Sequence, residues 1–138
     1  MGIKQISVFL ENTTGRLFEV TKTLKTAGIN LRAISIADTQ DFGILRIIAD
    51  KTEEALTALN SAGFTTGLSD VIAVEIDDKP GSLANLMEFL QNSNVNIEYL
   101  YASLEGKAGK AVVIFKLEDH SKGLNIMSQN NQKLVEEF

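Results

Sequence analysis

The stretch DDKPGSL (residues 77–83) joins an alternating apolar run, VIAVEI (71–76), to a run with helical spacing, LANLMEFL (83–90). The stretch ENTTGRL (11–17) occupies the same kind of junction near the N-terminus. Each stretch places a carboxylate, a glycine and a leucine at the same spacing, where a strand pattern gives way to a helix pattern. The two stretches therefore predict one strand–turn–helix unit that occurs twice.

The duplication extends along the chain when Gly15 is aligned with Gly81. This alignment pairs Ile6 with Ile72, Val8 with Val74, Leu17 with Leu83, Leu24 with Leu90 and Asn30 with Asn96. Farther along, ILRII (44–48) matches VVIFK (112–116) once the second hairpin is given two more residues. Because the hydrophobic register is kept throughout, the sequence predicts a tandem repeat with domains 1–68 and 69–138.

The first repeat predicts the order βαββαβ. Apolar residues alternate in its first strand, and others recur at helical spacing in the helix that follows. The inward positions are Ile6, Val8 and Leu10 in the strand and Leu17, Val20, Leu24 and Ala27 in the helix. Gly28 stands where a helix should end. Strands are expected at 31–37 and 43–49, a second helix at 52–62 and a last strand at 64–68.

The second repeat predicts the same order. VIAVEI is its first strand, and the following helix turns Leu83, Leu86, Met87 and Leu90 inward. Two strands, 96–103 and 110–117, flank a polar hairpin turn, and a helix is expected at 119–129. The end of the chain, NQKLVEEF (131–138), is short and polar, so the sequence leaves open whether a sixth element forms there.

A βαββαβ unit of this length predicts an α+β fold of the ferredoxin-like type. Each unit should have an antiparallel four-stranded sheet with both helices on one face. The other face is left bare, and bare apolar sheet faces are typical of association surfaces. The units are therefore expected to pair, within the chain or between chains.

The composition limits the possible partners. The net charge of −5 argues against a nucleic-acid surface, which needs clustered Lys and Arg. The 138 residues contain no cysteine, which excludes disulfides and thiolate chemistry. No apolar run approaches the length of a membrane span, and the N-terminus lacks a secretory pattern. We expect a cytoplasmic protein that contacts neither membrane nor nucleic acid.

The two junctions allow a structural and a functional interpretation. A glycine permits a tight turn and lets a ligand approach the backbone closely. The helix that follows begins with unpaired N–H groups and a partial positive charge, which attract a carboxylate or a phosphate. The simpler interpretation is a well-formed strand-to-helix turn, with Thr14 or Pro80 at the helix start. The residues alone leave both interpretations open.

The order of these motifs resembles the ACT domain. The pattern is strand–[DE]-x-x-x-G-x-L–helix–[GN]-[IV]-N-[LI]–strand, and it occurs as ENTTGRL with GINL (28–31) and as DDKPGSL with NVNI (94–97). The resemblance covers nearly the whole chain, and no segment is left for a catalytic domain. It therefore implies a stand-alone tandem ACT protein.

The resemblance implies a non-catalytic regulatory protein, since ACT domains are typically amino-acid sensors whose effectors lie at a pair interface near this loop. The ligand-binding candidates that it implies in the first repeat are Glu11, Asn12, Thr13, Thr14, Gly15, Arg16, Leu17, Asn30 and Leu31. The matching candidates in the second repeat are Asp78, Lys79, Pro80, Gly81, Ser82, Leu83, Asn96 and Ile97. A bound amino acid would place its carboxylate on helix-start N–H groups and its ammonium on Glu11, Asp77 or Asp78.

Alternatives remain at several of these positions. Asn30 and Asn96 also fit a purely structural turn between helix and strand. His120, the only histidine, lies beside acidic residues but has no second ligand at metal-site spacing, so we expect no metal, no cofactor and no enzyme. We expect the first repeat to bind the ligand. We also expect the chain to form a homodimer. The rival function is a protein-interaction module that has the fold, carries no ligand and associates with a partner enzyme.

Overall fold

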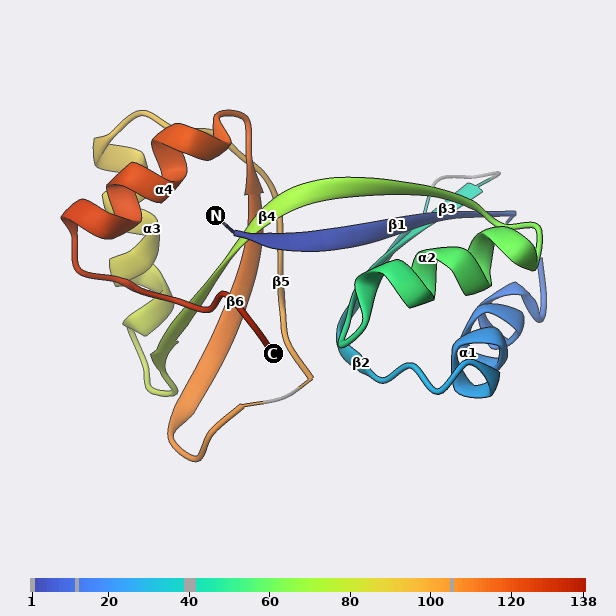
Figure 1. Cartoon of the computed structure of the whole chain (residues 1–138). Helices are drawn as coiled ribbons and strands as arrows, with labels where there is room; N and C mark the ends of the chain where they lie inside the picture. Colours follow the sequence, from blue (N-terminus) through green and yellow to red (C-terminus); the bar gives the residue numbers. More distant parts are fainter. Residues whose placement is uncertain (1, 12, 39–41, 105) are drawn as a thin grey trace. The chain divides into compact units, whose positions relative to one another are not determined.

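The computed structural model describes residues 2–11, 13–38, 42–104 and 106–138. Its contacts divide the chain into two compact units (Figure 1). The first unit is Lys4–Ser69, and the second is Asp70–Phe138 together with Gly2 and Ile3. Each unit has the βαββαβ order, so the predicted ferredoxin-like α+β fold is confirmed.

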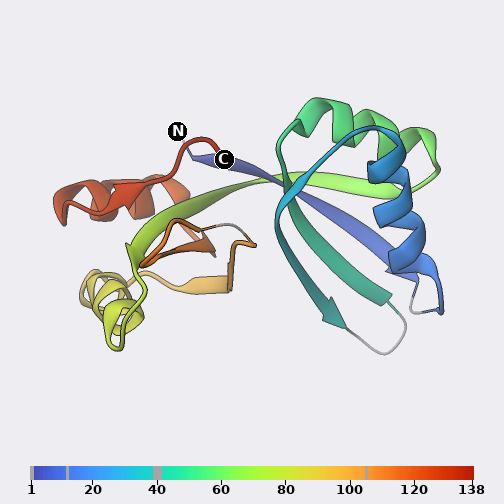
Figure 2. The same cartoon turned by 90° about the horizontal axis from the view of Figure 1, so that it is seen from below.

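The first unit has its strands in the order β2-β3-β1-β4. Its elements are β1 (Ile3–Glu11), α1 (Arg16–Thr26), β2 (Leu31–Asp38), β3 (Phe42–Ala49), α2 (Thr52–Ser61) and the beginning of β4 (Thr65–Asp77). Both β1 and β2 run antiparallel to β3. The helices α1 and α2 contact each other and lie on the same face of the sheet (Figure 2).

The second unit has its strands in the order β7-β4-β6-β5. Its elements are the remainder of β4, α3 (Ser82–Asn92), β5 (Ile97–Ala102), β6 (Lys110–Leu117), α4 (His120–Gln129) and β7 (Lys133–Leu134). The element left open at the end of the chain is therefore a short strand, which pairs with β4. The N–H of Val135 extends this pairing by donating to the carbonyl of Ala73 at 2.8 Å.

The strand β4 is longer than the sequence pattern predicts. The runs at 64–68 and 71–76 were expected to be separate strands, but Thr65–Asp77 is continuous. No proline interrupts the sequence between the two runs, and the polar pair Ser69–Asp70 can stay extended. The fourth strand of the first unit and the first strand of the second unit are therefore one element.

Each unit has its own hydrophobic core between helices and sheet. The predicted strand positions Ile6, Val8 and Leu10 and the helix positions Val20, Leu24, Leu86 and Leu90 are all buried. The prediction is wrong for Leu17, Leu83 and Ala27, which are exposed. Side chains on a helix lean toward its N-terminus, so leucines in the first turn extend past the point where the strand ends. Ala27 is the C-cap residue that follows α1 and lies beyond its sheet-facing turns.

The helices of the two units end in the same backbone motif with different residues. After α1, Ile29 N–H donates to the Leu24 carbonyl at 2.9 Å, and Gly28 has φ 73°. After α3, Val95 N–H donates to the Leu90 carbonyl at 3.1 Å, and Asn94 has φ 56°. At each helix end, a left-handed residue comes directly before the residue whose N–H makes this bond, which is the arrangement of the Schellman motif. The motif confirms Gly28 as the end of the first helix.

Candidate functional site

The candidate site is the corner between the first strand and the first helix of each unit. The first corner follows β1 and the second follows β4. Gly15 and Gly81 precede the helices there, with φ of 92° and 90°. This left-handed conformation strains any residue with a Cβ, so the backbone itself requires glycine at both corners.

The two corners also share their hydrogen bonds. Thr13 N–H donates to the Glu11 carbonyl at 2.8 Å, and Lys79 N–H donates to the Asp77 carbonyl at 3.0 Å. Each glycine carbonyl then accepts the first helical bond, at 3.0 Å in both corners. Among the described residues, no side chain caps the N-terminus of α1 or α3. First-turn N–H groups of both helices are therefore without a side-chain acceptor.

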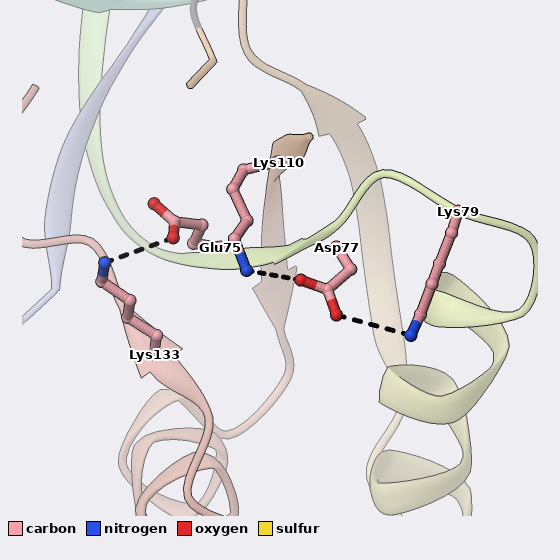
Figure 3. Close-up of polar contacts among 5 residues, drawn as sticks. All are labelled: Glu75, Asp77, Lys79, Lys110 and Lys133. Atoms are coloured by element: carbon pink, nitrogen blue, oxygen red, sulfur yellow. Dashed lines mark hydrogen bonds and ion pairs between the residues drawn. The ribbon is translucent and has the colours of Figure 1, made fainter. Parts of the chain in front are cut away.

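Lysines surround the carboxylate of the second corner. Lys110 Nζ lies 2.5 Å from Asp77 Oδ1, and Lys79 Nζ lies 3.6 Å from Oδ2 (Figure 3). The hydrogen bond from Lys110 is the main cause that lowers the pKa of Asp77, followed by the charges of Lys110 and Lys79. The same bond raises the pKa of Lys110. Asp77 is therefore held in its ionised form by cations of its own unit.

A second ion pair lies beside the first. Lys133 Nζ, on β7, is 3.2 Å from Glu75 Oε1, whose side chain is only 11% exposed (Figure 3). An open groove of about 350 Å³ passes these pairs and the start of α3. It is lined by Glu75, Ile76, Asp77, Lys79, Ser82, Asn85, Leu86, Phe89, Asn131, Gln132 and Lys133. The second corner is thus an open depression lined by charged, polar and apolar side chains.

The first corner has different side chains at the equivalent positions. Glu11 pairs across the strands with Phe42, whereas Asp77 pairs with Lys110. Arg16 is the cation of this corner, but its guanidinium is bound to Glu19 at 2.5 Å. It also lies over the Phe64 ring, 4.7 Å from the centroid. Among the described residues, the Glu11 carboxylate has no ion pair.

The predicted residues do not all come together within one unit. The predicted residues of each corner follow one another along the chain. Asn12, which was among them, lies outside the described residues. Leu31 pairs with Ala49 at one end of β3, while Glu11 pairs with Phe42 at the other. At ~3.3 Å per residue, these ends of β3 are about 20 Å apart. Asn30 and Leu31 therefore lie at the opposite end of the sheet from the first corner.

The second unit repeats this separation. Ile97 pairs with Leu117 at one end of β6, while Asp77 pairs with Lys110 at the other. Two open depressions of about 460 Å³ each flank Asn96. Asn96 also has a structural role, because its carbonyl accepts from Glu118 N–H at 3.2 Å.

Asn30 has a comparable structural role in the first unit. Its N–H donates to Asp50 Oδ1 and its carbonyl accepts from Asp50 N–H, both at 3.0 Å. The main chain of Asn30 therefore holds the start of β2 against the end of β3, which fits the structural interpretation of this residue.

Several residues of the second corner were not predicted as site residues. They are Glu75, Ile76, Asn85, Leu86, Phe89, Lys110, Asn131, Gln132 and Lys133. Lys110 is more than thirty residues from Asp77 in the chain, and only the register of β4 and β6 brings them together. The sequence did not fix the length of the second hairpin, so the register of β4 and β6 could not be predicted from it. Lys133 comes from the short strand that the sequence left open.

A tandem pair of βαββαβ units with a left-handed glycine at each first corner is the architecture expected of a double ACT domain. The family model of the ACT domain pair matches residues 1–138. The chain therefore belongs to the ACT domain pair family, which confirms the resemblance found in its sequence.

Solved structures agree with this assignment. Protein BT0572 from Bacteroides thetaiotaomicron is 36% identical, with a TM-score of 0.91 over 98% of this chain and 92% of that one. The regulatory subunit of aspartate kinase from Thermus thermophilus, in a ligand-free form, is 20% identical, with a TM-score of 0.68 over 94% and 93%. The same subunit from Thermus flavus is 21% identical, with a TM-score of 0.61 over 91% and 90%. No curated protein matches the chain.

The described part of the chain also bears on membrane-spanning helices and metal sites. No helix there combines the length and the apolar character needed to cross a membrane. Nor do its His, Asp and Glu residues form a group of three that could hold a metal ion.

Proposed function

We propose that the chain is a non-catalytic regulatory protein that binds an amino acid at its glycine corners. The observation that supports this most directly is the shared geometry of the corners. Both present first-turn N–H groups that no side chain caps, next to a carboxylate at the end of a strand. These groups suit the carboxylate and the ammonium of one amino acid.

The separation of the predicted residues supports a site between units. Asn30 and Asn96 lie about 20 Å from the corner of their own unit, at ~3.3 Å per strand residue. A neighbouring unit in antiparallel orientation would bring its asparagine to that corner. We therefore propose a ligand at an interface of ACT units, in a homodimer with repeats 1–68 and 69–138. Binding there favours one pairing over another, which is how such a protein would regulate an enzyme.

The test is a thermal-shift screen of the full chain against the twenty standard amino acids. A ligand that binds only the folded state stabilises it by about 2.7 kcal/mol at a hundredfold excess over its Kd. We expect at least one amino acid to raise the melting temperature. The variant Gly15→Val should weaken binding, with circular dichroism confirming that the fold is intact. A screen without any shift would count against the sensor.

A second candidate is a protein-interaction module without a ligand. The observation that favours it is the apolar surface of the first unit, where Phe18 is 65% and Phe42 58% exposed. Large exposed apolar side chains are typical of association surfaces. Under this alternative, no amino acid shifts the melting temperature, and Phe18→Ser abolishes association with the partner enzyme.

A further inference from the structure

Glu11 and Asp77 occupy equivalent positions in the two units but have different neighbours. Each is the last paired residue of its strand before the corner. Glu11 pairs with Phe42, and Asp77 pairs with Lys110. Two residues farther along the chain, the first corner has Thr13 where the second has Lys79. Two uncharged residues thus replace the two lysines that contact Asp77.

From this difference we infer that Lys110 and Lys79 exclude a ligand's ammonium group from the second corner, so that one amino acid binds per chain, at the first corner. The inference rests on the proposed function and assigns it to one of the two sites. Lys110 and Lys79 then act as specificity-determining residues, and the second corner is a structural connection between β4, β6 and the start of α3.

The exclusion has a physical basis in competition between the lysines and a ligand's ammonium group for the Asp77 carboxylate. Lys110 Nζ is tethered 2.5 Å from Asp77 Oδ1, so a free ammonium must displace a group with a high effective concentration. Lys79, at 3.6 Å, adds a second positive charge that repels the incoming one. Exposed ion pairs are individually weak, so exclusion depends on both lysines together, and we expect binding at the second corner to be weaker by more than about tenfold.

The neighbours of Glu11 also indicate a class of ligand. Phe42 lies directly across from Glu11, and Phe9 lies on the same face of β1, two residues before it. Both rings are largely exposed. A carboxylate beside exposed aromatic rings suits an amino acid that carries an ammonium and an apolar side chain. The second corner has Lys110 and Glu75 at these two positions, so it lacks the exposed aromatic rings that lie beside Glu11.

The test is calorimetric titration of the full chain with the standard amino acid that gives the largest thermal shift. We expect one site per chain and an apolar amino acid. The matched variants Glu11→Gln and Asp77→Asn remove one carboxylate charge each. The first should weaken binding at least tenfold, and the second by less than about twofold, because the tethered lysines already neutralise Asp77.

The double variant Lys110→Phe with Lys79→Thr replaces both lysines with the residues at the equivalent positions of the first corner. We expect the stoichiometry to rise from one to two sites per chain. Lys133→Ala is the control, because Lys133 binds Glu75 and should leave one site. If the double variant still has one site, the two lysines do not exclude the ligand.

Two results would overturn the inference while leaving the proposed function intact. They are two equal sites in the unaltered chain, and greater loss of binding with Asp77→Asn than with Glu11→Gln. If none of the twenty amino acids produces a thermal shift or heat of binding, the proposed function fails, and this inference fails with it.

Discussion

The first and second corners have nearly the same backbone but opposite side-chain chemistry. Gly15 and Gly81 differ by only two degrees in φ. The strand pairing places Glu11 beside an aromatic ring and Asp77 beside a lysine. Large exposed apolar side chains also gather in the first unit, with Phe9, Phe18 and Phe42 among them.

This difference shows which properties the fold fixes. The glycine conformation and the turn hydrogen bonds are imposed by the strand-to-helix connection, so both copies keep them. The side chains around the carboxylate are free of that constraint, and they determine what each corner can bind. Variants made at matched positions therefore separate what the fold requires from what a site requires.

The largest effect is expected from the matched core leucines. Leu24 and Leu90 are 2% and 1% exposed in the cores of the first and second units. Replacement of either by alanine should cost about 2–5 kcal/mol of unfolding free energy, because each leaves a cavity. Urea unfolding followed by circular dichroism measures this cost. A two-step transition with only one step shifted per variant would show that the units unfold separately.

A smaller effect is expected where the two cores differ. Gly123 lies in α4 where the sequence match places Ala55 in α2. A Cβ at Gly123 would lie 2.9 Å from Ile72 Cδ1 and still closer to Leu117 Cδ1. Gly123→Ala should therefore destabilise the chain by about 1–3 kcal/mol through overpacking, despite the better helix propensity of alanine.

The control for this prediction is the reverse change in the first unit. Ala55→Gly should cost about 1 kcal/mol, because glycine lowers helix propensity. Urea unfolding of both variants gives the comparison. A Gly123→Ala variant more stable than the unaltered chain would show that Leu117 and Ile72 can move aside.

Much of the fold could be predicted because burial and backbone rules act locally. Ile6, Val8 and Leu10 alternate in the sequence and are buried in the structure. Gly28 ends its helix as predicted, since only a few residue types tolerate a left-handed conformation. Leu17 was misplaced because periodicity shows which stripe of a helix a residue occupies but not where the neighbouring strand ends.

The side-chain environment of the corners could not be predicted in the same way. Lys110 reaches Asp77 only through the register of β4 and β6, and register depends on hairpin geometry. The distance between Asn30 and the first corner likewise follows from the direction of the strands. Motif residues alone give neither the register of two strands nor the distance between the ends of a sheet.

A nearly equal effect at the two corners is expected from the glycines. A Cβ at Gly15 or Gly81 would meet no atom within 4 Å, so the cost of alanine comes from the backbone alone. We expect Gly15→Ala and Gly81→Ala each to cost about 1 kcal/mol, because alanine resists a left-handed φ. Thermal unfolding of both variants measures this. A much larger cost at one corner would show that their backbones are not equivalent.

The smallest effect is expected from the ion pair that sets the corners apart. The pKa of Asp77 is lowered in the folded chain, so its contribution to stability is present above its ordinary pKa of 3.8 and is lost as the pH falls through the lower folded value. Asp77→Asn should therefore reduce stability slightly at pH 7 and have less effect near pH 3. Salt should also diminish the difference, since the pair is exposed.

Urea unfolding of the single variants Asp77→Asn and Lys110→Ala and of their double variant forms a cycle that isolates this pair. Lys110 provides the main bond that lowers the pKa of Asp77, so the double variant should be no less stable than either single variant at neutral pH. If the effects of the two single variants instead add, the lysine and the carboxylate act independently. The charge difference between the corners would then rest on Lys79 alone.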